Sequence, residues 1–235
     1  MGRNYNVVLK AFRALDEPEL CRKFIEGHTE VLSRHNFGHI RSANPAWMFN
    51  PNAYVILAYN KARPEILLGG GRIEIKTKKL QLPVENSLAS RDPKILELVK
   101  AEMPGTSEFC GLWNSREAVG RKIITIIVMY GFSLLSKLNL NSCFLLCSPH
   151  TFYLAEMLGC RMIKELGNEG SFNYPTDRFR AYVWVKDDVR FLQTVIPYIK
   201  ERVVSLREHS DQVYLEGHIT KGLNVHYEDM IQYEA

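Results

Sequence analysis

A basic turn between two apolar stretches is the part of the sequence most suited to bind a ligand. Arg116, Gly120, Arg121 and Lys122 follow a predicted strand over residues 108–114 and open a predicted buried helix over residues 118–138. A helix start offers free backbone N–H groups and a positive dipole end, both of which favour phosphate. The turn therefore predicts a site for a phosphate-bearing cofactor. The alternative is an ordinary charged turn that caps the helix.

Glu108 stands at the start of the strand that leads into this turn. A carboxylate beside a cleft can have a raised pKa, which suits a general base. The alternative is a solvent-exposed acid at the end of a strand.

Arg72 and Glu74 are two residues apart in a predicted strand and share one face of it. A guanidinium binds a carboxylate in a bidentate manner, so Arg72 is a candidate contact for a substrate carboxylate. The alternative is that the two side chains pair with each other or with a neighbouring strand.

His150 and Tyr153 follow a predicted strand over residues 142–147 and open the next helix. Either side chain is a candidate general acid. The alternative is that both residues serve only in helix capping and packing.

Hydrophobic periodicity and turn residues predict the elements that position these side chains. A glycine triplet at residues 69–71 indicates a bulge or a close approach of another backbone or ligand. The tail over residues 213–235 matches no element. The predicted strands cover residues 5–12, 53–60, 66–77, 108–114, 142–147, 161–166 and 179–186, and the predicted helices cover residues 17–35, 93–102, 118–138, 149–158 and a segment that starts at Asp187 or Asp188 and kinks at Pro197.

Composition excludes several classes of protein. The 235 residues are 46% hydrophobic, which is enough for a sizeable core. A net charge of +4 without a basic run argues against a nucleic-acid binder. We expect a cytoplasmic protein, because the sequence shows neither an N-terminal apolar segment nor an apolar run long enough to span a bilayer. The five cysteines lie among apolar neighbours, so we expect reduced core thiols and no metal site.

The order of the predicted elements resembles the GNAT acyltransferase superfamily over roughly residues 5–187. In that family an (R/Q)-x-x-G-x-(G/A) loop after the fourth strand holds the coenzyme A pyrophosphate, and a Tyr-x-x-x-Gly-Phe-like motif follows the fifth strand. Residues 109–115, 116–122 and 153–160 are similar to the fourth strand, the loop and the second motif. Three positions differ from the family pattern: Glu117 for Arg/Gln, Lys122 for a small residue, and Ala155 for a general-acid tyrosine.

The resemblance implies that the backbone of Leu112, Trp113 and Asn114 pairs with pantetheine where the fourth strand parts from the fifth. For the side chain of Trp113 the alternative is a place in the core.

A narrower resemblance is to acyl-homoserine-lactone synthases and long-chain N-acyl amino acid synthases, which usually take acyl groups from acyl carrier protein. It rests on Gly70-x-Arg72, Leu82-Pro83 and Glu108, with Gly111 in place of an arginine of that pattern.

We therefore expect an α/β (α+β) fold of the GNAT type, with a central mixed and mostly antiparallel sheet flanked by helices. A GNAT-like domain would span residues 1–187. A C-terminal helix and tail over residues 188–235 would pack on that domain or on a partner subunit of a homodimer.

The resemblance implies an N-acyltransferase that moves an acyl group from acyl-CoA or acyl carrier protein to a small-molecule amine by direct attack. A coenzyme A thioester would be the co-substrate in the first case. The alternative class is a non-catalytic GNAT-fold ligand-binding or regulatory protein.

Overall fold

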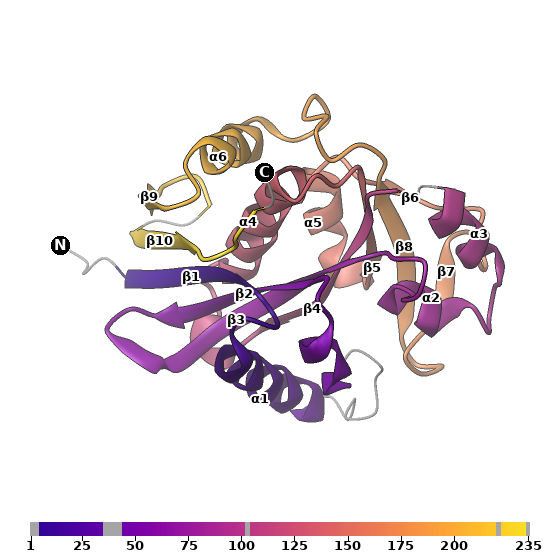
Figure 1. The fold of residues 1–235 in the computed structure, drawn as a ribbon, viewed down its shortest axis with the longest axis horizontal. Coiled ribbons are helices and arrows are strands. Elements are labelled where there is room, and N and C mark those ends of the chain that lie inside the picture. Colours follow the sequence, from indigo (N-terminus) through magenta and orange to yellow (C-terminus); the bar gives the residue numbers. More distant parts are fainter. Residues whose placement is uncertain (1–4, 35–43, 102–103, 220–221, 234–235) are drawn as a thin grey trace.

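A single mixed sheet of ten strands runs through the molecule (Figure 1). The structure is a computed structural model and describes residues 5–34, 44–101, 104–219 and 222–233. The strand order is β6-β8-β5-β4-β3-β2-β1-β10-β9, and β7 pairs with the first three residues of β8. The pairs β1–β10 and β4–β5 are parallel, and the other pairs in this order are antiparallel. The expected mixed, mostly antiparallel sheet is confirmed.

The elements alternate along the chain much as the periodicity predicts. The strands are β1 (Tyr5–Arg13), β2 (Ala53–Asn60), β3 (Arg63–Ile75), β4 (Thr106–Asn114), β5 (Ser142–Cys147), β6 (Arg161–Met162), β7 (Ser171–Asn173), β8 (Arg180–Lys186), β9 (Gln212–Glu216) and β10 (Leu223–Asp229). The helices are α1 (Pro18–Arg34), α2 (Pro83–Leu88), α3 (Lys94–Ala101), α4 (Ile123–Lys137), α5 (Phe152–Met157) and α6 (Pro197–Glu208), with short 3-10 helices η2 (Pro45–Phe49), η3 (Arg116–Ala118) and η4 (Pro149–Thr151).

Helices cover both faces of the sheet. Figure 1 shows α1 on one face and α4 on the other, with α6 outside α4. The side chains of α4 are buried nearly all round because one side of the helix meets the sheet and another side meets α6. The α-helix begins at Ile123, later than predicted, because Lys122 adopts a left-handed conformation (φ 56°) and η3 forms the preceding turn.

The glycine triplet in β3 lets side chains on both faces of the sheet approach this strand closely. A Cβ on Gly70 would lie 2.6 Å from the ring of Phe24 in α1, and a Cβ on Gly71 would lie 2.7 Å from the ring of Phe109. The register between β3 and β4 also shifts between Gly70 and Arg72. Both alternatives predicted for this segment, a bulge and a close approach, are therefore present.

Pro197 begins helix α6 and does not kink it. The prediction of a kink was wrong, because a proline without an N–H suits the first turn of a helix. The predicted strand over residues 161–166 is reduced to β6, and α2 and β7 carried no sequence signal strong enough to predict them. Residue 35, at the end of the first predicted helix, lies outside the described residues.

The tail that matched no element adds two strands to the sheet. β10 runs parallel to β1, and β9 pairs with β10 at the sheet edge. A partly buried ion pair supports this addition, because Lys137 Nζ of α4 lies 2.8 Å from Asp229 Oδ2. Asp229 also accepts a hydrogen bond from the Tyr233 hydroxyl at 2.7 Å.

No helix in the described ranges has both the length and the apolar character needed to cross a membrane.

A substitution in α1 tests how closely this helix packs on β4. A Cβ at Gly27 would overlap the indole of Trp113. We expect Gly27→Ala to lower the free energy of unfolding by about 1–3 kcal/mol through overpacking. This loss should exceed the helix-propensity gain of alanine over glycine, about 1 kcal/mol. Chemical denaturation measures the difference.

The control is Glu26→Ala, at the exposed neighbouring position, which we expect to change stability by less than about 0.5 kcal/mol. Equal stability of the two variants would contradict the close packing of α1 on β4.

Candidate active site

Strands β4 and β5 part from each other in the middle of the sheet. They pair only at Thr106–Ser142, Ser107–Cys143 and Glu108–Phe144. Beyond Glu108, β4 continues along β3 as far as Asn114. The register between β3 and β4 shifts next to Gly111, which adopts a positive φ of 57°. Strand β4 therefore bulges at this point. The parting opens a cavity of about 280 Å³ between the two strands.

The cavity has an apolar and a polar part. The apolar part comes mainly from β4, β5, α4 and α5, and its residues are Phe109, Leu112, Ile124, Val128, Leu145 and Leu154. The polar part includes side chains from α1, α2 and β4, and from the segment before β8. Its residues include His28, Ser87, Glu108, Cys110 and Tyr174.

Glu108 lines the cavity and is only 2% exposed. The alternative of a solvent-exposed strand-end acid was therefore wrong. Burial raises the pKa of Glu108 to about 8, and the nearby Glu74 carboxylate adds to the increase. The Val84 N–H, which donates to Glu108 Oε2 at 2.6 Å, and the Arg72 cation act in the opposite direction without cancelling it. Glu108 is thus a carboxyl group that changes its charge near neutral pH.

Arg72 and Glu74 pair with each other. Arg72 Nε and Nη2 lie 2.8 and 2.7 Å from the same oxygen of Glu74. The guanidinium also lies over the ring of Trp47 at 4.6 Å. Its Nη1 atom is buried without a hydrogen-bond partner among the described residues. The alternative of a mutual pair is confirmed, and one buried donor of Arg72 remains unused.

A second cavity of about 400 Å³ lies on the other side of this pair. Its wall contains Arg72, Glu74 and Trp47 together with four side-chain amides, those of Asn44, Asn50, Gln81 and Asn86. Pro83 lines both cavities, and Glu74 is directly opposite Glu108 in the β3–β4 register. The buried charges therefore lie at the boundary between an apolar cavity and a polar one.

A third carboxylate completes this charged cluster. Glu85 accepts the Leu82 N–H at 2.7 Å and lies 3.0 Å from Lys76 Nζ. Leu82-Pro83 thereby starts α2, whose Val84 N–H binds Glu108. The sequence pattern at Leu82-Pro83 thus marks the loop that holds the buried acid.

The basic turn lies at the start of α4, next to the apolar cavity. Gly120 has a φ of +76° with open space around it, and Lys122 is the left-handed residue before the helix. The Thr125 and Ile126 amides donate to the Lys122 carbonyl, so Ile123 and Ile124 carry the first amides without a partner within the helix. Ile124 also lines the cavity.

The cations of the turn are not equivalent. Arg121 stacks on the ring of Tyr5 at 3.8 Å and donates from Nε to the Glu117 carbonyl at 3.3 Å. Within the described part of the chain, Arg116 and Lys122 are exposed and form no comparable contact, so their cations are more available for a ligand.

His150 and Tyr153 do not line the cavity. His150 is exposed in η4, and Tyr153 is 46% exposed on α5. From the same segment Thr151 and Leu154 reach the cavity instead. The geometry gives no support to the proposed acid role of either residue.

Trp113 packs in the core, as the alternative for its side chain predicted. Its ring lies 5.9 Å from that of Phe24, edge to face. Of the three residues proposed to pair with pantetheine, Leu112 lines the cavity, whereas Trp113 and Asn114 continue β4 beyond it.

His28 and Tyr174 were not predicted as site residues, yet both line the cavity. Burial and the Arg72 cation lower the pKa of His28 to about 4, so this imidazole is neutral near pH 7. The Tyr174 hydroxyl accepts a hydrogen bond from Ser87 Oγ at 3.1 Å. His28 lies on the buried face of α1, but Tyr174 stands in a loop without any periodic signal.

No family model and no curated protein sequence matches the chain. Solved structures do match its fold. The N-acyl amino acid synthase FeeM from uncultured soil microbes superposes with a TM-score of 0.58 at 14% identity, covering 81% of this chain and 95% of that one. The CoA-dependent acyl-homoserine lactone synthase BjaI, solved with SAM and isopentyl-CoA, gives 0.57 at 12% identity and covers 84% and 90%.

An acyl-CoA N-acyltransferase from Pseudomonas aeruginosa gives a TM-score of 0.50 at 12% identity, covering 77% of this chain and 99% of that one. The chain therefore has the GNAT-like fold that its element order predicted, and its resemblance to the synthases is confirmed at the level of the fold.

The raised pKa of Glu108 predicts how stability depends on pH. The folded state holds this proton more tightly than the unfolded chain, whose glutamates have an ordinary pKa of 4.5. The contribution of Glu108 to stability is therefore fully present below about pH 4.5 and is lost as pH rises through about 8. Each unit between the two pKa values corresponds to about 1.4 kcal/mol.

Urea denaturation of the wild type and Glu108→Gln between pH 5 and 9 tests this expectation. Glutamine keeps an acceptor for the Val84 N–H, so the loss of stability with rising pH should be smaller in this variant. Glu156→Gln, at an exposed position in α5, should keep the wild-type slope. Parallel curves for all three proteins would show that Glu108 titrates at its ordinary pKa.

Proposed function

We propose that this protein is an N-acyltransferase that moves an acyl group from an acyl thioester to an amine by direct attack. The observation that carries the proposal is the parting of β4 and β5 around a cavity that contains a buried carboxyl group with a raised pKa. The fold shared with acyl-transferring enzymes supports it.

The donor would enter from the start of α4. The amides of Ile123 and Ile124, with Arg116 and Lys122 beside them, suit the phosphate groups of coenzyme A or the phosphopantetheine of acyl carrier protein. The turn is open at Gly120, where a Cβ would meet nothing within 4 Å. From this turn the cavity leads along β4, where Leu112 and the bulged Gly111 face the thioester.

The acceptor amine would come from the polar cavity on the other side of Arg72 and Glu74. The free Nη1 of Arg72 would bind an acceptor carboxylate or carbonyl, and the side-chain amides would hold its other polar groups. Glu74 would orient Arg72 through their pair. Arg72 would thereby have the substrate-binding role that its residue type predicts, and Glu74 would share in that site as its partner.

Glu108 would accept the proton that the amine loses. The amine nitrogen forms a bond to the thioester carbon, the carbon–sulfur bond breaks, and the leaving thiolate takes up the proton that Glu108 has accepted from the amine. A base with a pKa of about 8 is partly ionised at neutral pH and can take this proton during the attack. Cys110 lines the same cavity, but burial raises the pKa of its thiol, which disfavours a thiolate nucleophile.

The catalytic role of Glu108 predicts a large effect of a small substitution. We expect Glu108→Gln to lower kcat by about 10²- to 10⁴-fold, the usual contribution of a general base. Wild-type kcat should rise with pH and level off above about 8, the pKa of Glu108. Release of free thiol from acyl thioesters in the presence of a panel of primary amines and amino acids measures both.

Tyr153→Phe is the matched control, because Tyr153 lies outside the cavity, and we expect near wild-type turnover. A large loss in Tyr153→Phe with little effect in Glu108→Gln would reverse the two assignments. Thioester binding without turnover for any amine would favour a non-catalytic ligand-binding protein with this fold.

Two opposite charge changes test the phosphate site. Glu117→Gln should strengthen the binding of coenzyme A and Lys122→Gln should weaken it, since each changes the charge of the turn by one unit. We expect a change of about two- to fivefold for each, as for one charge at an exposed helix terminus. Calorimetric titration at low and high salt measures the affinities, and both effects should shrink at high salt.

Lys94→Gln removes an exposed charge at the start of α3 and serves as the control. If all three variants bind equally well, the turn is only a charged helix cap.

A further inference from the structure

The side chain of Phe109 lies between two cavities. Phe109, Val128 and Leu145 line the donor cavity between β4 and β5, and the same three residues line a small inner chamber of about 10 Å³. Neighbouring residues of β4 alternate between the two faces of the sheet, so Glu108 and Cys110 face α1 while Phe109 faces α4. The ring thus stands at the apolar end of the donor cavity, away from the buried carboxylates.

Two glycines hold the ring in this position. A Cβ on Gly71 of β3 would lie 2.7 Å from Cζ of Phe109, and a Cβ on Gly131 of α4 would overlap the ring from the helix side. Phe109 therefore occupies space that the sheet and the helix both leave free through the absence of a side chain. The position is 7% exposed, so the ring is a fixed part of the core.

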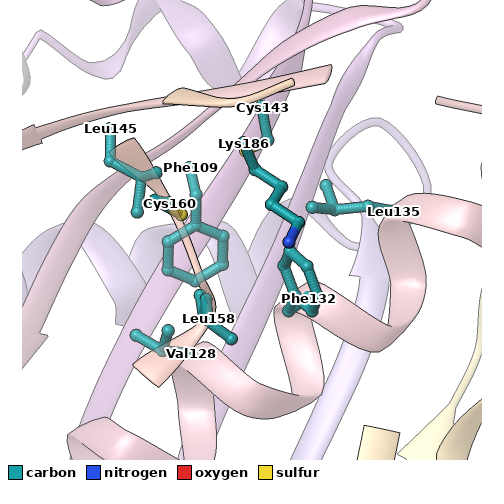
Figure 2. A pocket seen from close by; sticks show the side chains of 9 residues that line it. All are labelled: Phe109, Val128, Phe132, Leu135, Cys143, Leu145, Leu158, Cys160 and Lys186. Carbon is teal, nitrogen blue, oxygen red and sulfur yellow. The ribbon is translucent and has the colours of Figure 1, made fainter. Parts of the chain in front are cut away.

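The inner chamber continues behind the ring. Besides the three shared residues, its wall consists of Phe132, Leu135, Cys143, Leu158, Cys160 and the stem of Lys186. Figure 2 shows the Phe109 ring pointing into this group, with the Lys186 amine directed past it toward Phe132 and Leu135. That amine donates to Thr194 Oγ1 at 2.9 Å, which leaves the aliphatic stem of Lys186 to face the chamber.

We infer that Phe109 sets the length of the acyl chain that the donor cavity accepts, by closing the cavity against the inner chamber. This inference rests on the proposed function. With the ring in place, a short acyl chain ends against Phe109 beside Val128 and Leu145. Without it, the donor cavity and the chamber form one apolar channel that extends toward Leu158 and Phe132.

Binding of acetyl-, butanoyl-, octanoyl- and dodecanoyl-coenzyme A to the wild type, Phe109→Ala and Phe109→Leu tests the inference. Calorimetry measures the affinities, and the same acyl groups on acyl carrier protein form a second panel. We expect the wild type to prefer the two short chains. Phe109→Ala should gain at least about tenfold in affinity for the longer chains relative to butanoyl, since one methylene in a fitted apolar pocket already changes binding by about this factor.

Phe109→Leu keeps the apolar contact with Gly71 and Gly131 and should shift the preference in the same direction by a smaller amount. It keeps the test informative if Phe109→Ala fails to fold. Phe132→Ala enlarges the chamber behind the ring without opening the donor cavity. It should leave the chain-length preference of the wild type unchanged.

A ligand-free measurement tests the position of the Phe109 ring between Gly71 and Gly131 directly. Gly131→Ala should destabilise the wild type, because the new Cβ overlaps the Phe109 ring, and should cost less stability in the Phe109→Leu background. An equal loss of stability from Gly131→Ala in both backgrounds would overturn this position of the Phe109 ring and the inference built on it.

Thioester binding with the same chain-length preference in the wild type and both Phe109 variants would overturn the inference and leave the proposed function intact. Tight wild-type binding of dodecanoyl-coenzyme A would overturn it in the same way. No binding of any thioester to any of the proteins would instead overturn the proposed function, and the inference with it.

Discussion

The candidate site depends on how strand β4 pairs with its two neighbouring strands. On one side β4 is paired with β3 along most of its length, and on the other it meets β5 for only three residues. Backbone groups in the interior of a protein must find hydrogen-bond partners, and an open strand edge readily accepts an extended ligand. The bulge at Gly111 creates this opening, and the apolar helix α4 closes its floor. A pantetheine arm, which is extended and carries amides, matches such an edge.

The same parting of strands determines the chemistry of the buried charges. Since β4 stays paired with β3, Glu108 is held opposite Glu74 and beside Arg72, away from water. Three carboxylates then face two cations in this cluster, those of Arg72 and Lys76. Burial is the main physical origin of the raised pKa of Glu108, and the nearby Glu74 and Glu85 carboxylates add to the increase. An acceptor amine that arrives in the polar cavity would meet a group ready to take up a proton.

The sequence predicted those parts of the fold that depend on local periodicity. The buried helix α4, the paired strands β2 and β3 and the strand–turn–helix at Arg116–Lys122 all follow from hydrophobic pattern and turn residues. The tail was different, because β9 and β10 are polar on alternate positions. These strands gain their stability from β1 and from Lys137, which pairs with Asp229, and both partners lie far from the tail in the sequence. The placement of Pro197 at the start of α6 likewise depended on where the preceding segment packs.

The candidate site was predictable to a similar extent. Glu108, Arg72 and Glu74 share one face of paired strands, and their types and spacing were enough to predict them as candidates. The burial of Glu108 was not predictable, since it depends on α2 reaching over β4 to donate the Val84 N–H. Tyr153 and His150 were chosen by their nearness to a motif in sequence, but a helix exposes part of its surface, and here Thr151 and Leu154 face the cavity. Tyr174 reaches the cavity from a loop, which no periodicity reveals.

The central claim is that an acyl thioester lies along the open edge of β4. Hydrogen exchange of the backbone amides, with and without butanoyl-coenzyme A at saturating concentration, tests this claim most directly. The account predicts slower exchange at residues 111–114 of β4 and at Ile123 and Ile124 of α4, with smaller changes in the rest of the sheet. Unchanged exchange at these positions, while the ligand protects another part of the chain or none, would contradict it.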